Sequence, residues 1–167
     1  CRSLILAAAV WQESSWLNKA LQTLQMLKQR CYLPDKGMCH YYDGHPRLWG
    51  LLTDQTAVGS ALNLAYQQTG ELWSLEMSRS LAEHCMNKLL APRGGFYDSV
   101  PDPTAPGALA VPHLDFSHNV RTARWLLELT ALTRDIRFAE VATGALRRNL
   151  DRYPRYGSMA AGFALAV

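Results

Sequence analysis

The stretches AAVWQESSWL at 8–17, LAYQQTGELW at 64–73 and LTALTRDIRF at 129–138 are variants of one pattern, and this repeat decides the fold. Each begins as an apolar helical ending and continues through a polar break. Each then reaches an aromatic residue that opens a second helical run. Repeats of this kind are typical of stacked helical hairpins, because each hairpin buries its apolar face against its neighbours. The sequence therefore predicts an all-α fold of stacked antiparallel hairpins.

Helical spacing of apolar residues extends outward from the repeat over nearly the whole chain. Further helices are expected from about 16 to 30, from 53, from 75 to 89, from 117 to 132 and from 136 to 146, and another begins near Arg155. Thr53 or Asp54 is suited to cap the helix that it opens, and Asp135 is a predicted N-cap. No segment alternates apolar and polar residues as a strand does. We expect six to seven helices, with the aromatic residues Trp16, Trp73 and Phe138 in the core.

Two kinds of connection separate these helices. The turns at 14–15, 69–71 and 133–135 are short, whereas the connections 31–52 and 91–116 contain 22 and 26 residues. Connections longer than about 12–15 residues are usually functional or disordered, and the Trp, Tyr, His and Asp content of these two favours order. Because helices alternate in direction, all long connections should lie at one end of the molecule. We call this the long-loop end and expect the functional residues there.

Composition and charge exclude several classes of function. A net charge of +3 without a basic run argues against nucleic acid. The apolar run near the start is too short to span a membrane, and no secretion signal is visible, so we expect a cytoplasmic protein. Cys39, His40 and His45 lack a second ligand pair, so no metal and no cofactor is expected. Four cysteines without ligand spacing indicate reduced thiols.

Three motifs carry a family resemblance: LTDQTA at 52–57, AYQQTGE at 65–71 and GGFYD at 94–98. They resemble the helical domain of the YyaL-like family, which includes the relatives of spermatogenesis-associated protein 20. The family has a Pro-Ser-Gly-Asn element after an Asp; here Phe116 and His118 replace its Pro and Gly, while Asp115, Ser117 and Asn119 match.

The resemblance implies part of an (α/α)6 toroid, similar to N-acylglucosamine 2-epimerases, glycosidases and unsaturated-uronyl hydrolases. In the family, a thioredoxin-like domain precedes this toroid. We expect residues 1–167 to form a single hairpin domain that is a fragment of a longer toroid. Its apolar flanks should then pack against the remainder of the ring or a second subunit.

Function is expected to reside in a carbohydrate pocket at the long-loop end. Asp54 and Asp98 are the candidate catalytic residues, because two carboxylates at one cavity mouth can serve as general acid and base. The candidate substrate-binding residues are polar or aromatic and lie in the long connections or near the helix starts that follow them: Trp49, Gln55, Tyr97, Asp115, His118, Asn119 and Arg121. Arg121 and Arg124, three apart on one helix, are suited to a substrate carboxylate.

Each candidate also has a purely structural interpretation, since Asp54 and Asn119 suit helix caps and Asp98 suits a turn. Whether the chain is an enzyme stays open at this point. If it is, it resembles a glycoside hydrolase or a sugar epimerase that uses His113 or His118 for proton transfer. The alternative is a non-catalytic interaction or regulatory domain within a larger thioredoxin-domain-containing protein.

Overall fold

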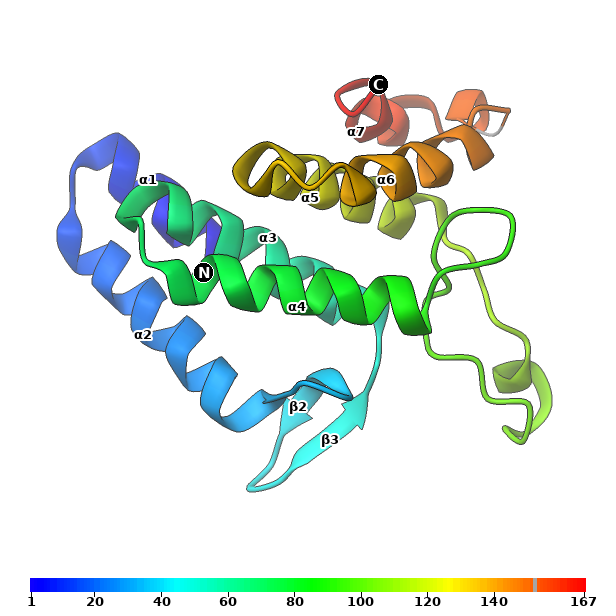
Figure 1. The fold of residues 1–167 in the computed structure, drawn as a ribbon, viewed down its shortest axis with the longest axis horizontal. Coiled ribbons are helices and arrows are strands. Elements are labelled where there is room, and N and C mark those ends of the chain that lie inside the picture. The colour runs from blue at the N-terminus through cyan, green and yellow to red at the C-terminus, as the bar shows by residue number, and fades with distance from the viewer. Residues whose placement is uncertain (152) are drawn as a thin grey trace.

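The computed structural model describes residues 1–151 and 153–167 and shows three helical hairpins in succession (Figure 1). The hairpins are formed by α1 with α2, α3 with α4, and α5 with α6. Their bounds are Arg2–Trp11, Ser14–Cys31, Leu52–Thr69, Leu72–Lys88, Phe116–Thr133 and Ile136–Arg148, in chain order. The 3₁₀ segments η1, Gly107–Ala110, and η2, Tyr153–Ala160, and the short helix α7, Ala161–Ala164, complete the helical elements. The predicted stack of antiparallel helical hairpins is confirmed.

Helices α1, α3 and α5 pack side by side as an inner layer, and α2, α4 and α6 each cover the inner helix that precedes them. The short turns lie together at the left of Figure 1, and the long connection between α4 and α5 lies at the right. The N–H of Leu52 donates to the carbonyl of Asp98 (2.9 Å), which joins the two long connections. The predicted long-loop end therefore exists.

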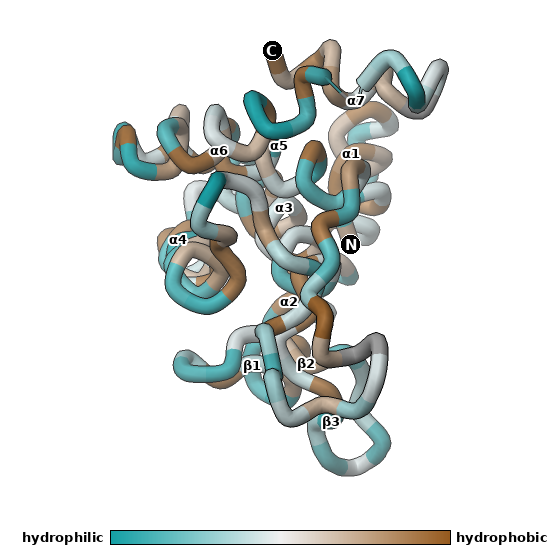
Figure 2. The backbone as a smooth tube through the Cα atoms, turned by 90° about the vertical axis from the view of Figure 1, so that its right-hand side faces the viewer, coloured by the Kyte–Doolittle hydropathy of each residue, from teal (hydrophilic) through white to brown (hydrophobic). Residues whose placement is uncertain are grey.

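A small antiparallel sheet occupies the first long connection, where no strand was expected. Its strands are β1, Tyr32–Leu33, β2, Gly37–Tyr42, and β3, Pro46–Trp49, in the order β1-β2-β3. Along β2 the first three residues are buried and the last three exposed, so the strand has no alternating pattern for sequence reasoning to detect. Figure 2 shows the sheet at the opposite side of the molecule from the C-terminus.

A closed ring of buried hydrogen bonds locks α3, α4 and α5 together. Trp125 donates from Nε1 to the Ser78 hydroxyl (3.0 Å), and Ser78 donates to Oδ1 of Asn63 (2.6 Å). Asn63 donates from Nδ2 to the backbone carbonyl of Trp125 (3.2 Å). Gly59 has no room for a Cβ because the indole of Trp125 lies against it. The polar network and the glycine together fix the spacing of the two inner helices.

Several local predictions need correction. Helix α3 begins at Leu52 without a side-chain cap, so neither Thr53 nor Asp54 caps it. Asp135 does cap α6, through the N–H of Arg137. Of the three repeated aromatics, Phe138 is fully buried, whereas Trp16 is 38% exposed and packs edge-on against Trp11. The position in the repeat marks a hairpin turn and does not guarantee burial.

Candidate functional site

A buried amide anchors the first long connection to the start of α3. Gln55 is fully buried, and its Oε1 accepts from the N–H of Met38 (2.7 Å) while its Nε2 donates to the Met38 carbonyl (3.2 Å). The same Nε2 donates to the carbonyl of Leu51 (3.0 Å). One side chain thus pairs both backbone groups of a β2 residue that has no water to bond. Gln55, a predicted substrate-binding residue, is placed where it holds the sheet.

A second buried amide repeats the arrangement at the start of α5. Asn119 is 2% exposed; its Oδ1 accepts from the N–H of Phe96 (2.6 Å), and its Nδ2 donates to the Phe96 carbonyl (2.9 Å). Nδ2 also donates to the Asp115 carbonyl (2.8 Å). Asp115 itself caps α5 by accepting from the N–H of His118 (2.8 Å). The predicted binding residues Asn119 and Asp115 therefore define how the second long connection enters α5.

The two amide anchors belong to a second internal repeat, which sequence reasoning missed. Tyr32 pairs with Met38, and Leu90 pairs with Phe96 at the same spacing. The segments LPDKGM at 33–38 and APRGGF at 91–96 share a Pro and, three residues later, a Gly. Gly37 and Gly95 have positive φ, and a Cβ at either would meet the anchoring amide at 2.5 or 3.1 Å. The Pro-x-x-Gly spacing is the signal by which the sequence could have shown this repeat.

Asp54 forms an acid–imidazole pair with His40 on the exposed half of β2. His40 Nδ1 lies 3.1 and 3.2 Å from the two carboxylate oxygens of Asp54. The Asp54 side chain is 20% exposed and that of His40 is 49% exposed. Burial raises the pKa of Asp54 above its ordinary value, and the bond from His40 offsets part of the rise. The carboxyl group is therefore held nearer to its protonated form, as a general acid requires.

Asp98 lies at the same end, but its carboxylate faces its own loop. It accepts from the N–H of His113 (3.3 Å) and from the Ser99 hydroxyl (3.5 Å). Its backbone is bonded to Leu52, two residues before Asp54. In the second internal repeat, Asp98 occupies the position of His40, and His118 occupies that of Asp54. Each half of the site thus brings one carboxylate and one imidazole to corresponding positions.

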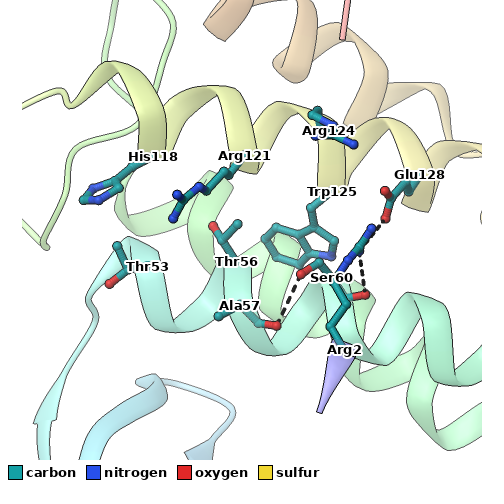
Figure 3. A pocket seen from close by; sticks show the side chains of 10 residues that line it. All are labelled: Arg2, Thr53, Thr56, Ala57, Ser60, His118, Arg121, Arg124, Trp125 and Glu128. Carbon is teal, nitrogen blue, oxygen red and sulfur yellow. Dashed lines mark hydrogen bonds and ion pairs between the residues drawn. The ribbon is translucent and has the colours of Figure 1, made fainter. Parts of the chain in front are cut away.

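A groove of about 340 Å³ runs between the inner helices α3 and α5 (Figure 3). This volume is at the lower end of the range for small-molecule pockets, roughly 300–1,000 Å³. His118 and Thr53 lie at one end of the groove, and Arg2 and Glu128 lie at the other. The remaining lining residues come from the facing sides of the two helices: Thr56, Ala57, Ser60, Arg121, Arg124 and Trp125.

Of the predicted site residues, the groove brings together His118 and Arg121. Asp54 is not part of the groove lining, but it follows Thr53, which is. Tyr97 is half-buried and its N–H donates to the Leu89 carbonyl (2.8 Å). Trp49 is half-buried on β3, with the Lys36 ammonium 5.8 Å from its ring centroid.

Within residues 1–151 and 153–167, no group of three or more His, Cys, Asp or Glu side chains is arranged to hold a metal ion. In the same described part, none of the helices has both the length and the apolar character needed to cross a membrane.

No known protein-family model matches the chain, and no curated protein matches it. Solved structures do. A family 76 glycoside hydrolase from a bovine Bacteroides thetaiotaomicron strain is similar over 90% of this chain, with a TM-score of 0.74 and 16% identity. The unsaturated glucuronyl hydrolase of Bacillus sp. GL1, responsible for the degradation of glycosaminoglycan, is also similar over 90% of this chain, with a TM-score of 0.71 and 19% identity.

A family 76 mannosidase of Bacteroides thetaiotaomicron is similar with a TM-score of 0.71 and 12% identity, again over 90% of this chain. The alignments cover 33%, 44% and 42% of these three chains, so this chain spans less than half of their length. At these identities the likeness shows the fold alone. The chain has the fold of part of an (α/α)6 six-hairpin glycosidase-like toroid, the fold that the family resemblance implies.

Proposed function

We propose that the chain binds and processes a carbohydrate at the long-loop end, with Asp54 as the acid–base residue. The observation that carries the proposal is the Asp54–His40 pair, a mostly buried carboxyl of raised pKa that follows Thr53, a residue of the groove lining, in the sequence. In its protonated form Asp54 would donate a proton to a glycosidic oxygen, and His40 would stabilise the carboxylate that remains. Asp98 is the second proposed carboxylate, activating water or attacking the sugar carbon.

The similar solved structures support this proposal, since two are hydrolases of glycoside hydrolase family 76 and a third is a glucuronyl hydrolase. Tyr97 and Trp49 are proposed to contact the sugar from the two long connections. Gln55 and Asn119 are proposed to act indirectly, by holding those connections in place.

The test is an assay of the hydrolysis of a panel of aryl glycosides and disaccharides, measured as the release of reducing ends. Asp54→Asn should lower kcat by about 10²–10⁴-fold, the usual contribution of a general acid. Asp98→Asn should also lower it. The matched control is Asp43→Asn, which changes a half-exposed loop carboxylate paired with Arg47 and should leave kcat unchanged. An Asp54→Asn variant as active as the unmodified chain would remove Asp54 from the mechanism.

A second candidate is a sugar epimerase or isomerase, favoured by the position of His118. His118 lines the groove, and its buried Nδ1 lies 3.7 Å from an Asp115 carboxylate oxygen, with no hydrogen-bond partner among the described residues. An imidazole so placed can remove a proton from a sugar carbon. The measurement is ¹H NMR of sugars incubated in D₂O. Loss of a C–H signal that is abolished by His118→Gln supports epimerisation, and complete retention excludes it.

A third candidate is the interaction domain of a larger YyaL-like, thioredoxin-domain-containing protein, acting without catalysis. It is favoured by apolar exposure on α1, where Val10 is 73% and Trp11 is 68% exposed. A second subunit, or the remainder of a toroid, is the proposed occupant of this flank. Sedimentation velocity tests self-association: Trp11→Glu should convert an oligomer to a monomer, and a chain that is monomeric from the start contradicts the second-subunit form.

A further inference from the structure

The groove between α3 and α5 carries an excess of positive charge. Its lining holds three arginines and one acidic residue, Glu128. Arg2 uses that acid, with Nη1 3.5 Å from the Glu128 carboxylate and 3.4 Å from the Ser60 carbonyl. Within the described residues, Arg121 and Arg124 form no ion pair. Two guanidinium groups therefore line the groove without a compensating carboxylate.

Arginines on the outer helices are arranged differently. Arg79 on α4 pairs with Glu83 and Asp135, and Arg137 on α6 pairs with the same two acids. These four side chains neutralise one another on the outer surface. The comparison shows that the outer arginines are neutralised by acids, whereas among the described residues no carboxylate lies within ion-pair distance of Arg121 or Arg124.

The groove-facing stripe of α5 also has the spacing for shared recognition. His118, Arg121 and Arg124 follow one another at intervals of three residues, which brings their side chains to one face of the helix. Figure 3 shows them in line above α3, with His118 nearest the long-loop end. Guanidinium groups bind carboxylate and phosphate oxygens through two parallel hydrogen bonds, a geometry that a neutral hydroxyl does not match.

We propose that this groove selects a sugar that carries an anionic group, a carboxylate or a phosphate, bound by Arg121 and Arg124. The sugar ring then lies toward Thr53 and His118, and the bond to be processed lies toward Asp54. This selection of anionic sugars rests on the proposed function, because it requires that the groove bind a sugar. Charge on the ligand is attracted by both guanidinium groups, and the attraction is screened by salt.

The test is isothermal titration of the 167-residue chain with matched ligands. Glucose supplies a neutral ring, glucuronate a carboxylate, glucose 6-phosphate a phosphate, and inorganic phosphate the charge without the ring. We expect at least one acidic sugar to bind about tenfold or more tightly than glucose. Which acidic sugar binds more tightly then distinguishes carboxylate from phosphate. Added salt should lower the affinity for the acidic sugars and leave the affinity for glucose unchanged.

Arg121→Gln and Arg124→Gln should each lower the affinity for the preferred acidic sugar by about tenfold and leave glucose unaffected. Arg147→Gln is the control, since Arg147 is exposed on α6, away from the groove lining. Thermal melts confirm that each variant folds, so a loss of binding is not a loss of structure.

Equal affinity for glucose and both acidic sugars, unaffected by either arginine variant, would overturn the selection and leave the proposed carbohydrate function standing. Inorganic phosphate that binds as tightly as glucose 6-phosphate would also overturn it, because the ring then contributes nothing. If no sugar of the panel binds, both this inference and the proposed function fail for these sugars.

Discussion

The amide anchor at Asn119 gives the sharpest stability prediction. Asn119→Ala removes three hydrogen bonds of 2.6, 2.9 and 2.8 Å and leaves the N–H and C=O of Phe96 without partners. Phe96 is fully buried, so water cannot replace the amide. Each buried polar group left unpaired costs about 1–3 kcal/mol. The substitution should therefore lower the free energy of unfolding by about 2–6 kcal/mol, against a typical total of about 5–15 kcal/mol.

An isosteric variant separates hydrogen bonding from packing. Asn119→Asp keeps the shape and the acceptor for Phe96 N–H, but it sets a carboxylate oxygen against the carbonyls of Phe96 and Asp115. It should destabilise the fold at pH 7 at least as much as the alanine variant. Asn18→Ala, on the exposed face of α2, should change the free energy of unfolding by less than about 0.7 kcal/mol.

Urea denaturation followed by far-UV circular dichroism measures all three variants. If Asn119→Ala falls within about 0.5 kcal/mol of the unmodified chain, the amide does not anchor the second long connection, because surface substitutions have effects of that size.

Three further predictions concern packing, titration and thiols. Gly59→Ala should lower the free energy of unfolding by about 1–2 kcal/mol, because overpacking against the Trp125 indole of α5 outweighs a helix-propensity gain of about 1 kcal/mol. Gly144→Ala, which has open space at its Cβ, should raise the free energy of unfolding by up to about 1 kcal/mol. Urea melts that rank the two variants in the opposite order would contradict this packing. Because burial raises the pKa of Asp54, the folded state keeps that proton to higher pH than the unfolded state, so its ionisation costs stability as pH rises above the ordinary value of 3.8. The melting temperature of Asp54→Asn minus that of the unmodified chain should therefore increase from pH 3.5 to pH 7. A difference that stays constant across that range would refute the raised pKa. Burial raises the pKa of Cys31 to about 11, so a thiol reagent at pH 8 should label the exposed Cys1 and reach Cys31 only on unfolding, as mass spectrometry of the native and denatured chain will show.

Sequence periodicity was sufficient for the helices because their stability follows from one-dimensional patterns. The hairpin repeat, the short turns and the Asp135 cap each depend on residues within one or two turns of each other. The gathering of long connections at one end follows from the alternation of helices alone. These features needed no knowledge of tertiary contacts.

The arrangement of the site depends on tertiary contacts that sequence patterns do not predict. The sequence places Asp54 at a helix start, but its partner His40 comes from β2, a strand whose burial changes halfway along its length. Gln55 and Asn119 have the residue types of sugar ligands, and only their buried partners show that they hold backbone. The groove depends on the packing of α3 against α5, which no local pattern gives.

The central claim is that a sugar binds at the long-loop end, beside Asp54. The most direct measurement is a ¹H–¹⁵N NMR titration of the chain with glucose, glucuronate and glucose 6-phosphate. The backbone signals of His40, Thr53, Asp54, His118 and Arg121 should shift together with one dissociation constant, while Gln68 and Thr133 at the short turns stay unchanged. Shifts confined to the short-turn end, or none with any sugar of the panel, would contradict the claim.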